Sequence, residues 1–269
     1  MSRRCDDRVL ARARETTNRV ARTFSLACRL LPDEVRDDVY RLYLVFRTLD
    51  DLVDQRDPLA QARVEQIEAW CRSGNISSQE SLVLATLATR YPIPHAAVLD
   101  FCAGMREDLQ GERFATESDV DRYCYRVAGT VGIVMAEILG YRGDPADVHR
   151  TAAALGMAMQ RTNILRDIDE DRDNGRVYLS GAALARFGEP GIGRREALLR
   201  DQIERADRLY AAGLGGVRHL RRGRVAIRAA GSMYREILRQ LERDGYGAHP
   251  GRCVVPAPRK LLAAARGAL

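Results

Sequence analysis

The sequence predicts an all-α fold, and three observations point to it. Amphipathic or largely apolar segments of helical length follow one another along the chain. No segment shows the two-residue alternation of a β-strand, and no internal repeat recurs at a fixed period. No linker or change of composition divides the 269 residues. We therefore expect a single domain, residues 1–269, with one large core.

Helix-breaking residues set the expected element boundaries. Pro32 lies at the start of a helix, where proline is tolerated, and Asp57-Pro58 ends that helix. Pro92-Ile-Pro94 and the turn from Gly140 to Pro145 are further breaks, and Asn174-Gly175 caps a long helix. The expected helices cover residues 7–31, 34–55, 59–73, 78–91, 95–110, 118–141, 146–173, 181–187, 195–213 and 222–243, followed by a short basic tail over 252–269.

Composition narrows the class of protein. Hydrophobic residues make up 46% of the chain, yet no run approaches the ~20 apolar residues that a membrane span needs. The N-terminus lacks the apolar core of a signal peptide, so we expect a cytoplasmic protein. The six cysteines form no C-x-x-C pair, and we expect reduced thiols without a zinc site.

The chain is basic, with a formal net charge of +6 and a pI near 9.2. A basic surface favours nucleic acid or anionic lipid as a partner. No nucleic-acid motif occurs, and aromatic residues are only 6% of the chain, too few for stacking on bases. We therefore expect no nucleic-acid partner.

The expected helix over 146–173 carries a row of oxygen ligands. Helical spacing aligns Asn163, Asp167 and Asp171, with Gln160 and Arg166 beside them. Like charges four residues apart destabilise an isolated helix. A hard divalent cation such as Mg²⁺ would offset that repulsion and could be shared with substrate phosphates. The alternative is a solvated acidic face, but the aliphatic residues next to the row favour a buried helix.

A second acidic row lies on the expected helix over 34–55. Helical spacing aligns Tyr43, Arg47, Asp50 or Asp51, and Asp54, and apolar residues cover most of the remaining surface, which is typical of a core helix. Carboxylates on such a helix are unfavourable unless they are paired or bound to metal. Two such helices facing each other would form two acidic walls, and Mg²⁺ between them could hold a diphosphate.

Four motifs in a fixed order give a family resemblance. They are Asp50-x-x-x-Asp54, Tyr123-Cys-Tyr-x-Val-Ala-Gly-Thr-Val-Gly132, Asn163-Ile-Leu-Arg-Asp167-x-x-x-Asp171 and Gly175-Arg-Val-Tyr-Leu179. With them the chain resembles the trans-isoprenyl head-to-head synthases, which are the phytoene, dehydrosqualene and squalene synthases. The resemblance runs from about residue 22 to 260, and the motifs together are specific, although either aspartate motif alone is weak.

The resemblance implies a class I isoprenoid (terpenoid) synthase, a helical bundle around a central cavity. It implies a prenyltransferase that joins two geranylgeranyl or farnesyl diphosphates head to head through a cyclopropylcarbinyl diphosphate. The product would be of the phytoene or squalene type, and diphosphate would be released. The implied cofactor is Mg²⁺, with Mn²⁺ as a substitute, and NADPH is needed only if the product is squalene. Peripheral membrane contact is a further expectation, and the oligomeric state is left open.

The motifs also carry the expected site residues. The expected catalytic residues are Tyr43, Arg47, Asp50, Asp54, Asp167 and Asp171, and the expected metal ligands are Asp50, Asp54, Asn163, Asp167 and Asp171. The expected substrate-binding residues are Arg22, Thr23, Tyr43, Arg47, Tyr123, Gln160, Arg166, Arg176, Tyr178 and Tyr234. Arg22 has the alternative of an ordinary surface residue, Tyr234 that of a packing residue, and Asp108 is expected to be an accessory residue at most.

Some positions leave alternatives open. Gly129 and Gly132 predict a close approach, either by a neighbouring helix or by a prenyl tail. Arg161 and Asp169 depart from residues common in the family, which leaves the chain length of the substrate and the product undecided. Two other functions compete: a class I terpene cyclase acting on one prenyl diphosphate, and a non-catalytic scaffold. The scaffold predicts eroded aspartates, whereas all the motif aspartates are present.

Overall fold

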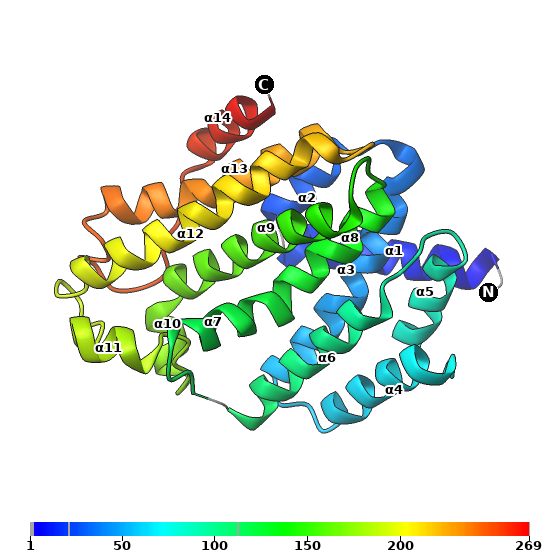
Figure 1. Ribbon diagram of the computed structural model, residues 1–269, viewed down its shortest axis with the longest axis horizontal. Helices are drawn as coiled ribbons and strands as arrows, with labels where there is room; N and C mark the ends of the chain where they lie inside the picture. Colours follow the sequence, from blue (N-terminus) through cyan, green and yellow to red (C-terminus); the bar gives the residue numbers. More distant parts are fainter. Residues whose placement is uncertain (1–2, 21, 112, 269) are drawn as a thin grey trace.

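The structure, a computed structural model, describes residues 3–20, 22–111 and 113–268. Over these residues it is an all-α bundle without a strand, as predicted, and its one isolated β-bridge joins Tyr141 to Leu220 (Figure 1). The elements are α1 (Arg3–Val20), α2 (Arg22–Cys28), α3 (Asp33–Asp54), α4 (Ala60–Ser73), α5 (Gln79–Ala88), α6 (His95–Gln110), α7 (Glu117–Cys124), η1 (Tyr125–Gly129), α8 (Thr130–Leu139), α9 (Pro145–Arg166), α10 (Ile168–Asp173), α11 (Gly181–Phe187), α12 (Glu196–Gly216), η2 (Val217–His219), α13 (Arg224–Arg243) and α14 (Ala257–Ala268).

Several expected elements were wrong. The expected helix over residues 7–31 is two helices, α1 and α2, and the expected helix over 118–141 contains the π-helical segment η1. The segment 146–173 is not one helix, because Asp167 leaves helical geometry with φ −107° and ψ 13° between α9 and α10. The hydrogen bonds from Asp167 N to Asn163 O and from Asp171 N to Asp167 O persist across this break, so the three side chains still follow one another by helical turns. The basic tail also forms a helix, α14, which buries Ala263 and packs against α13.

The helix α9 runs through the middle of the bundle and packs against α8, α12 and α13 (Figure 1). Between α8 and α9 the backbones almost touch. A Cβ added at Gly132 would lie 2.4 Å from the Ala152 carbonyl oxygen, and one at Gly156 would lie 2.2 Å from that of Ala128. Only glycine permits this approach. A neighbouring helix therefore makes a close contact with the glycine-containing motif, and because Gly132 also lines the cavity described below, the alternative of a prenyl tail stays open.

One departure from the family pattern is part of this packing. The Arg161 side chain is buried and points away from the cavity. Its Nε donates to Asp121 Oδ1 at 2.9 Å, its Nη2 to Glu117 Oε2 at 3.0 Å, and its Nη1 to Gln202 Oε1 at 2.9 Å. A buried guanidinium is tolerated only with such partners. Arg161 therefore ties α9 to α7 and α12 and does not shape the cavity.

Candidate active site

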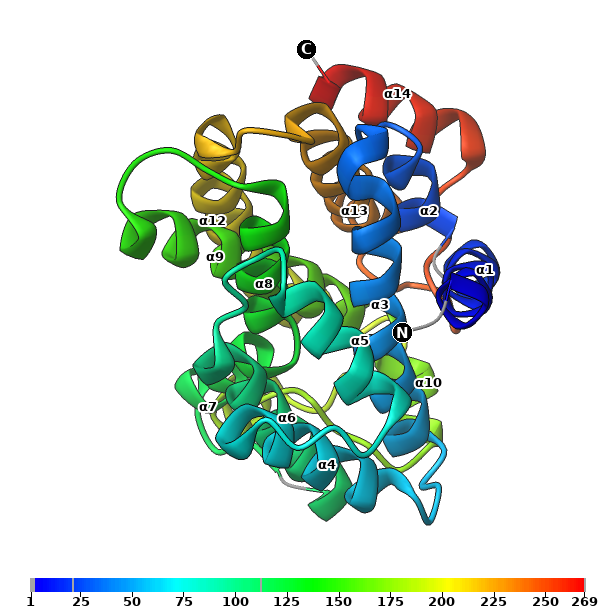
Figure 2. The ribbon, with the colours of Figure 1, turned by 90° about the vertical axis from the view of Figure 1, so that its right-hand side faces the viewer.

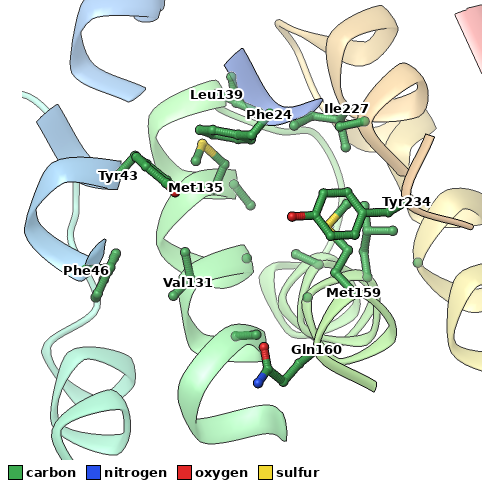
Figure 3. Close-up of a pocket in the computed structure, with 18 of the residues that line it drawn as sticks. Phe24, Tyr43, Phe46, Val131, Met135, Leu139, Met159, Gln160, Ile227 and Tyr234 are labelled. Atoms are coloured by element: carbon green, nitrogen blue, oxygen red, sulfur yellow. The ribbon is translucent and has the colours of Figure 1, made fainter. Parts of the chain in front are cut away.

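A cavity of about 310 Å³ lies between α3, α8, α9 and α13. One end is polar and is lined by Arg47, Asp50, Gln160 and Asn163, whereas Asp54, Asp167 and Asp171 do not line the cavity. The rest is apolar, and Figure 3 shows aliphatic and aromatic side chains from several helices pointing into it. These include Phe24, Phe46, Val131, Met135, Leu139, Met159 and Ile227.

Asp50 stands at the polar end, on α3. Arg47 Nη1 donates to Asp50 Oδ2 at 2.8 Å, and its Nη2 pairs with Asp51 Oδ1 at 2.5 Å. The Asp50 side chain lines the cavity and is 40% exposed. This partial desolvation raises the pKa of Asp50 to about 7, and repulsion from Asp54 adds to it. The Asp50 carboxyl group is therefore harder to ionise than an aspartate in water, even beside Arg47.

Asp54, one turn further along α3, pairs with Arg176, which lies in the segment after α10. Arg176 Nη1 pairs with Asp54 Oδ1, and Arg176 Nη2 donates to the Asp54 carbonyl oxygen at 3.0 Å. The sequence predicts that Arg176 contacts substrate. In the structure Arg176 contacts the first acidic row and holds the two acidic segments next to each other, and its role towards substrate stays a prediction.

The second row differs in its partners. Arg166 donates from Nε and Nη2 to the two carboxylate oxygens of Asp167, at 2.8 and 2.6 Å. Arg252 Nε adds a third contact to Asp167 at 3.1 Å. Asp171 has no ion pair within the described part of the chain. Burial, then the Asp167 and Asp54 charges among others, raise its pKa to about 7. Because Arg176 pairs with Asp54 and its backbone N–H donates to the Asp171 carbonyl oxygen at 2.8 Å, α10 and the end of α3 lie close together.

Asp169, the second departure from the family pattern, anchors this row. Its buried carboxylate accepts two hydrogen bonds from Arg195, at 2.7 and 2.9 Å, and one from Gly251 N at 3.0 Å. Arg195 also donates to the Gly247 carbonyl. These bonds fix α10 to the start of α12 and to the loop before α14. Asp169 is absent from the cavity wall, so it positions the row and does not shape the cavity.

Asn163 contributes an unsatisfied oxygen. Its Nδ2 donates to Gln160 Oε1 at 3.3 Å, whereas its Oδ1 is buried without a hydrogen-bond partner among the described residues. A buried acceptor without a hydrogen bond is unfavourable by about 1–3 kcal/mol. Both residues line the polar end of the cavity, as the sequence predicts.

Asp108, on α6, is more central than the sequence suggests. Tyr123 and Tyr178 donate to its two oxygens at 3.0 and 3.1 Å, and their rings stack with centroids 5.2 Å apart. Burial raises the pKa of Asp108 to about 6, although both hydroxyls oppose the shift. The signal available in the sequence is helical spacing, which aligns Asp108 with the buried Phe101 and Met105.

The remaining predicted residues lie near the apolar part. Tyr43 stacks on Phe24 with centroids 4.9 Å apart, and Tyr234 projects into the cavity from α13 (Figure 3). Thr23 is half-buried on α2, and its neighbour Phe24 is the residue that lines the wall. The Arg22 side chain lies outside the described residues.

The acidic side chains of the motifs come from two separate segments, α3 and the α9–α10 junction. Across residues 3–268, where described, no group of three or more His, Cys, Asp or Glu side chains is arranged to hold one metal ion by itself. Likewise, no described helix is long and apolar enough to cross a membrane.

An all-α bundle with two acidic segments beside one largely apolar cavity, each contributing one residue to its lining, is the class I isoprenoid synthase fold. The structure aligns with the crystal structure of a dehydrosqualene synthase with a TM-score of 0.88 at 25% identity, over 98% of this chain and 96% of that one. It also aligns with a squalene synthase of Alicyclobacillus acidocaldarius with a TM-score of 0.77 at 23% identity, over 90% and 95% of the two chains.

The sequence pattern of the squalene/phytoene synthase family matches residues 17–259, and the chain belongs to this family. It is 34% identical to the 15-cis-phytoene synthase of Synechococcus elongatus over 273 residues, which span 92% of this chain and 88% of the relative. It is 38% identical to a phytoene synthase of Thermus thermophilus, over 83% and 80% of the two chains. The chain is therefore a head-to-head prenyltransferase that acts on prenyl diphosphates, not a non-catalytic scaffold.

Proposed function

We propose that this chain condenses two prenyl diphosphates head to head, with Mg²⁺, through a cyclopropylcarbinyl diphosphate to a phytoene-type product. The observation that carries the proposal is that Asp50 and Asn163, one from each acidic segment, line a cavity that is otherwise largely apolar. Phytoene-type products are favoured because the curated relatives at 34% and 38% identity are phytoene synthases.

The donor set fits Mg²⁺. Asp50 and Asp171 are carboxylates whose pKa values are raised chiefly by burial and further by neighbouring carboxylates, and Asn163 offers a buried, unsatisfied oxygen. Mg²⁺ prefers oxygen ligands and is usually held by one or two carboxylates together with substrate phosphates. Two separate acidic walls therefore suit it without a three-carboxylate cluster. When bound, Mg²⁺ neutralises the leaving diphosphate as a Lewis acid.

Arginines at the polar end would bind the diphosphates. Arg47 bridges Asp50 and Asp51, and Arg166 holds Asp167 through a planar guanidinium fork. The guanidinium fork also matches phosphate oxygens. Metal bound to the aspartates would compete for these carboxylates and leave the guanidinium groups for the substrate. Gln160, beside Asn163, would orient the second diphosphate with its amide.

The apolar wall would protect the carbocation. Phe24, Phe46 and Met135 line the cavity with groups that offer water no partner, and a carbocation survives only where water is excluded. The hydroxyls of Tyr43 and Tyr234 would donate to diphosphate or line the cation path. No described histidine lines this cavity, so we assign the final proton loss to the released diphosphate and not to a side chain.

Product analysis tests the proposal. The purified enzyme is incubated with Mg²⁺ and either geranylgeranyl or farnesyl diphosphate, with and without NADPH, and the products are identified by mass. We expect a triene made of two prenyl units without NADPH. Hydrocarbon made from one prenyl unit would support the cyclase alternative, and strict dependence on NADPH would support a squalene-type reaction.

A further inference from the structure

The helix α14 carries aliphatic side chains on its outer side. Leu261 is 57% exposed and Leu262 is 50% exposed. The helix packs on α13 through small residues, since Ala263 is buried and Gly267 lies against Ser232. Helical spacing turns both leucines away from this contact. Both leucine side chains can therefore contact another molecule.

Two further exposed aliphatic residues lie at the same end of the molecule. Leu30 follows α2 and is 48% exposed, and Val225 begins α13 and is 46% exposed. The helices α2, α13 and α14 pack on one another through a small cluster, and both ribbon views place them along the upper side (Figures 1 and 2). We call this surface the α14 face; it consists of Leu30, Val225, Leu261, Leu262, Arg224, Arg259, Lys260 and Arg266.

The charge of the α14 face is uncompensated. Neither segment that supplies its basic residues, 208–235 or 245–269, contains an Asp or Glu. Within the described part of the chain, Arg224, Arg259, Lys260 and Arg266 bond to no other side chain. By contrast, Arg235 and Arg239 on the same α13 both pair with Asp207. Unpaired cations beside exposed leucines attract an anionic surface that also accepts apolar groups.

The α14 face lies outside the apolar end of the cavity. Ile227 lines the cavity, whereas Val225, two residues before it, is exposed. Leu139 lines the cavity too, and a Cβ added at Gly223 would meet Leu139 Cδ2 at 3.0 Å and Leu31 Cδ2 at 2.7 Å. A thin layer of side chains therefore separates this end of the cavity from the face.

We propose that the α14 face docks on an anionic phospholipid bilayer. The leucines enter the interface, and the basic side chains bind headgroup phosphates. Docking turns the apolar end of the cavity towards the hydrocarbon and leaves the acidic end, on α3 and α10, facing water. The use of this orientation, delivery of a prenyl product into the bilayer, rests on the proposed function; the docking itself does not.

Vesicle cosedimentation tests the docking. The full chain is mixed with phosphatidylcholine vesicles, with and without phosphatidylglycerol, at low and high salt. We expect salt-sensitive binding to the anionic vesicles. The variant Arg259→Gln/Lys260→Gln/Arg266→Gln should bind roughly two orders of magnitude more weakly. The matched control Arg113→Gln/Arg186→Gln/Arg194→Gln removes the same charge from exposed sites elsewhere and should change binding by no more than about threefold.

Equal loss in the two triple variants, or no binding by the wild type, would overturn the proposal. Leu261→Gln/Leu262→Gln should also weaken binding, and unchanged binding would contradict insertion of the leucines. Far-UV circular dichroism checks that each variant folds. Turnover of detergent-dispersed prenyl diphosphate is measured on the same samples: an inactive chain that binds vesicles contradicts only the proposed function, and an active chain that ignores them contradicts only the docking.

Discussion

The two acidic segments of the site are built differently. Asp50 and Asp54 lie on α3, an unbroken 22-residue helix whose remaining surface is largely core. Asp167 lies at the break between α9 and α10, where Arg166 and Arg252 bond to it, and Asp171 follows on α10, which is anchored through Asp169. Packing sets the first row, whereas charge pairs set the second. We therefore expect activity to be lost when an aspartate of the first row is replaced. The geometry of the second row should depend on ionic strength.

The largest effect should come from the packed row. Asp50→Asn removes a charge at the polar end of the cavity without changing volume, so kcat should fall on the order of 10²–10³-fold, with an unchanged helical signal. Asp51→Asn is the matched control, because Asp51 shares Arg47 but lies outside the cavity wall. Steady-state kinetics with saturating Mg²⁺ checks both variants. Near wild-type kcat for Asp50→Asn would remove the metal role of α3.

Breaking the anchor should destabilise the second row. Arg195→Met leaves the buried Asp169 without its main partner, which should lower the free energy of unfolding by about 3–5 kcal/mol. It should also raise the Mg²⁺ concentration for half-maximal activity. Arg161→Met breaks a buried ion pair with Glu117, away from the second acidic row. It should lower the free energy of unfolding without changing the Mg²⁺ concentration for half-maximal activity. Urea unfolding and Mg²⁺ titrations separate the two, and identical metal requirements would refute the positioning role of Asp169.

The raised pKa values near 7 of Asp50 and Asp171 predict how pH acts on the metal-free chain. Both groups bind protons more tightly in the folded state than the unfolded value near 3.8, so stability should fall as pH rises from about 4 to 7. Mg²⁺ needs the ionised forms, so its affinity and its effect on Tm should grow over the same range. Thermal unfolding with and without Mg²⁺ measures this, and a Tm increase independent of pH would contradict it.

The smallest effect should be at Asp108, which belongs to neither row. Tyr178→Phe removes a hydrogen bond to the ionised carboxylate, so the pKa of Asp108 should rise further above 6. The acidic limb of the kcat/KM profile should move to higher pH, with a loss of roughly tenfold or less at neutral pH. Tyr125→Phe, which affects the distant Asp100, is the control. An unmoved profile would separate Asp108 from catalysis.

What the sequence predicts well is local. Helical spacing alone aligns Asp50 with Asp54, and a helix that is apolar nearly all round is necessarily buried, so the first row follows without coordinates. The break at Asp167 does not, since the bonds that stabilise it come from Arg195 and Arg252, far away in the chain. For the same reason spacing does not reveal that Asp108 receives two tyrosines from other segments. The helix in the tail was missed although the segment is amphipathic.

The glycine contacts between α8 and α9 set a limit on how this enzyme can evolve. Because Gly132 and Gly156 leave no room for even a methyl group, the two helices cannot slide apart or be re-spaced by single substitutions. Adaptation to longer or shorter prenyl chains is thus directed to the opposite wall, where Phe24 and Ile227 project freely. Selection for new chain lengths should accumulate replacements there and leave the glycines untouched.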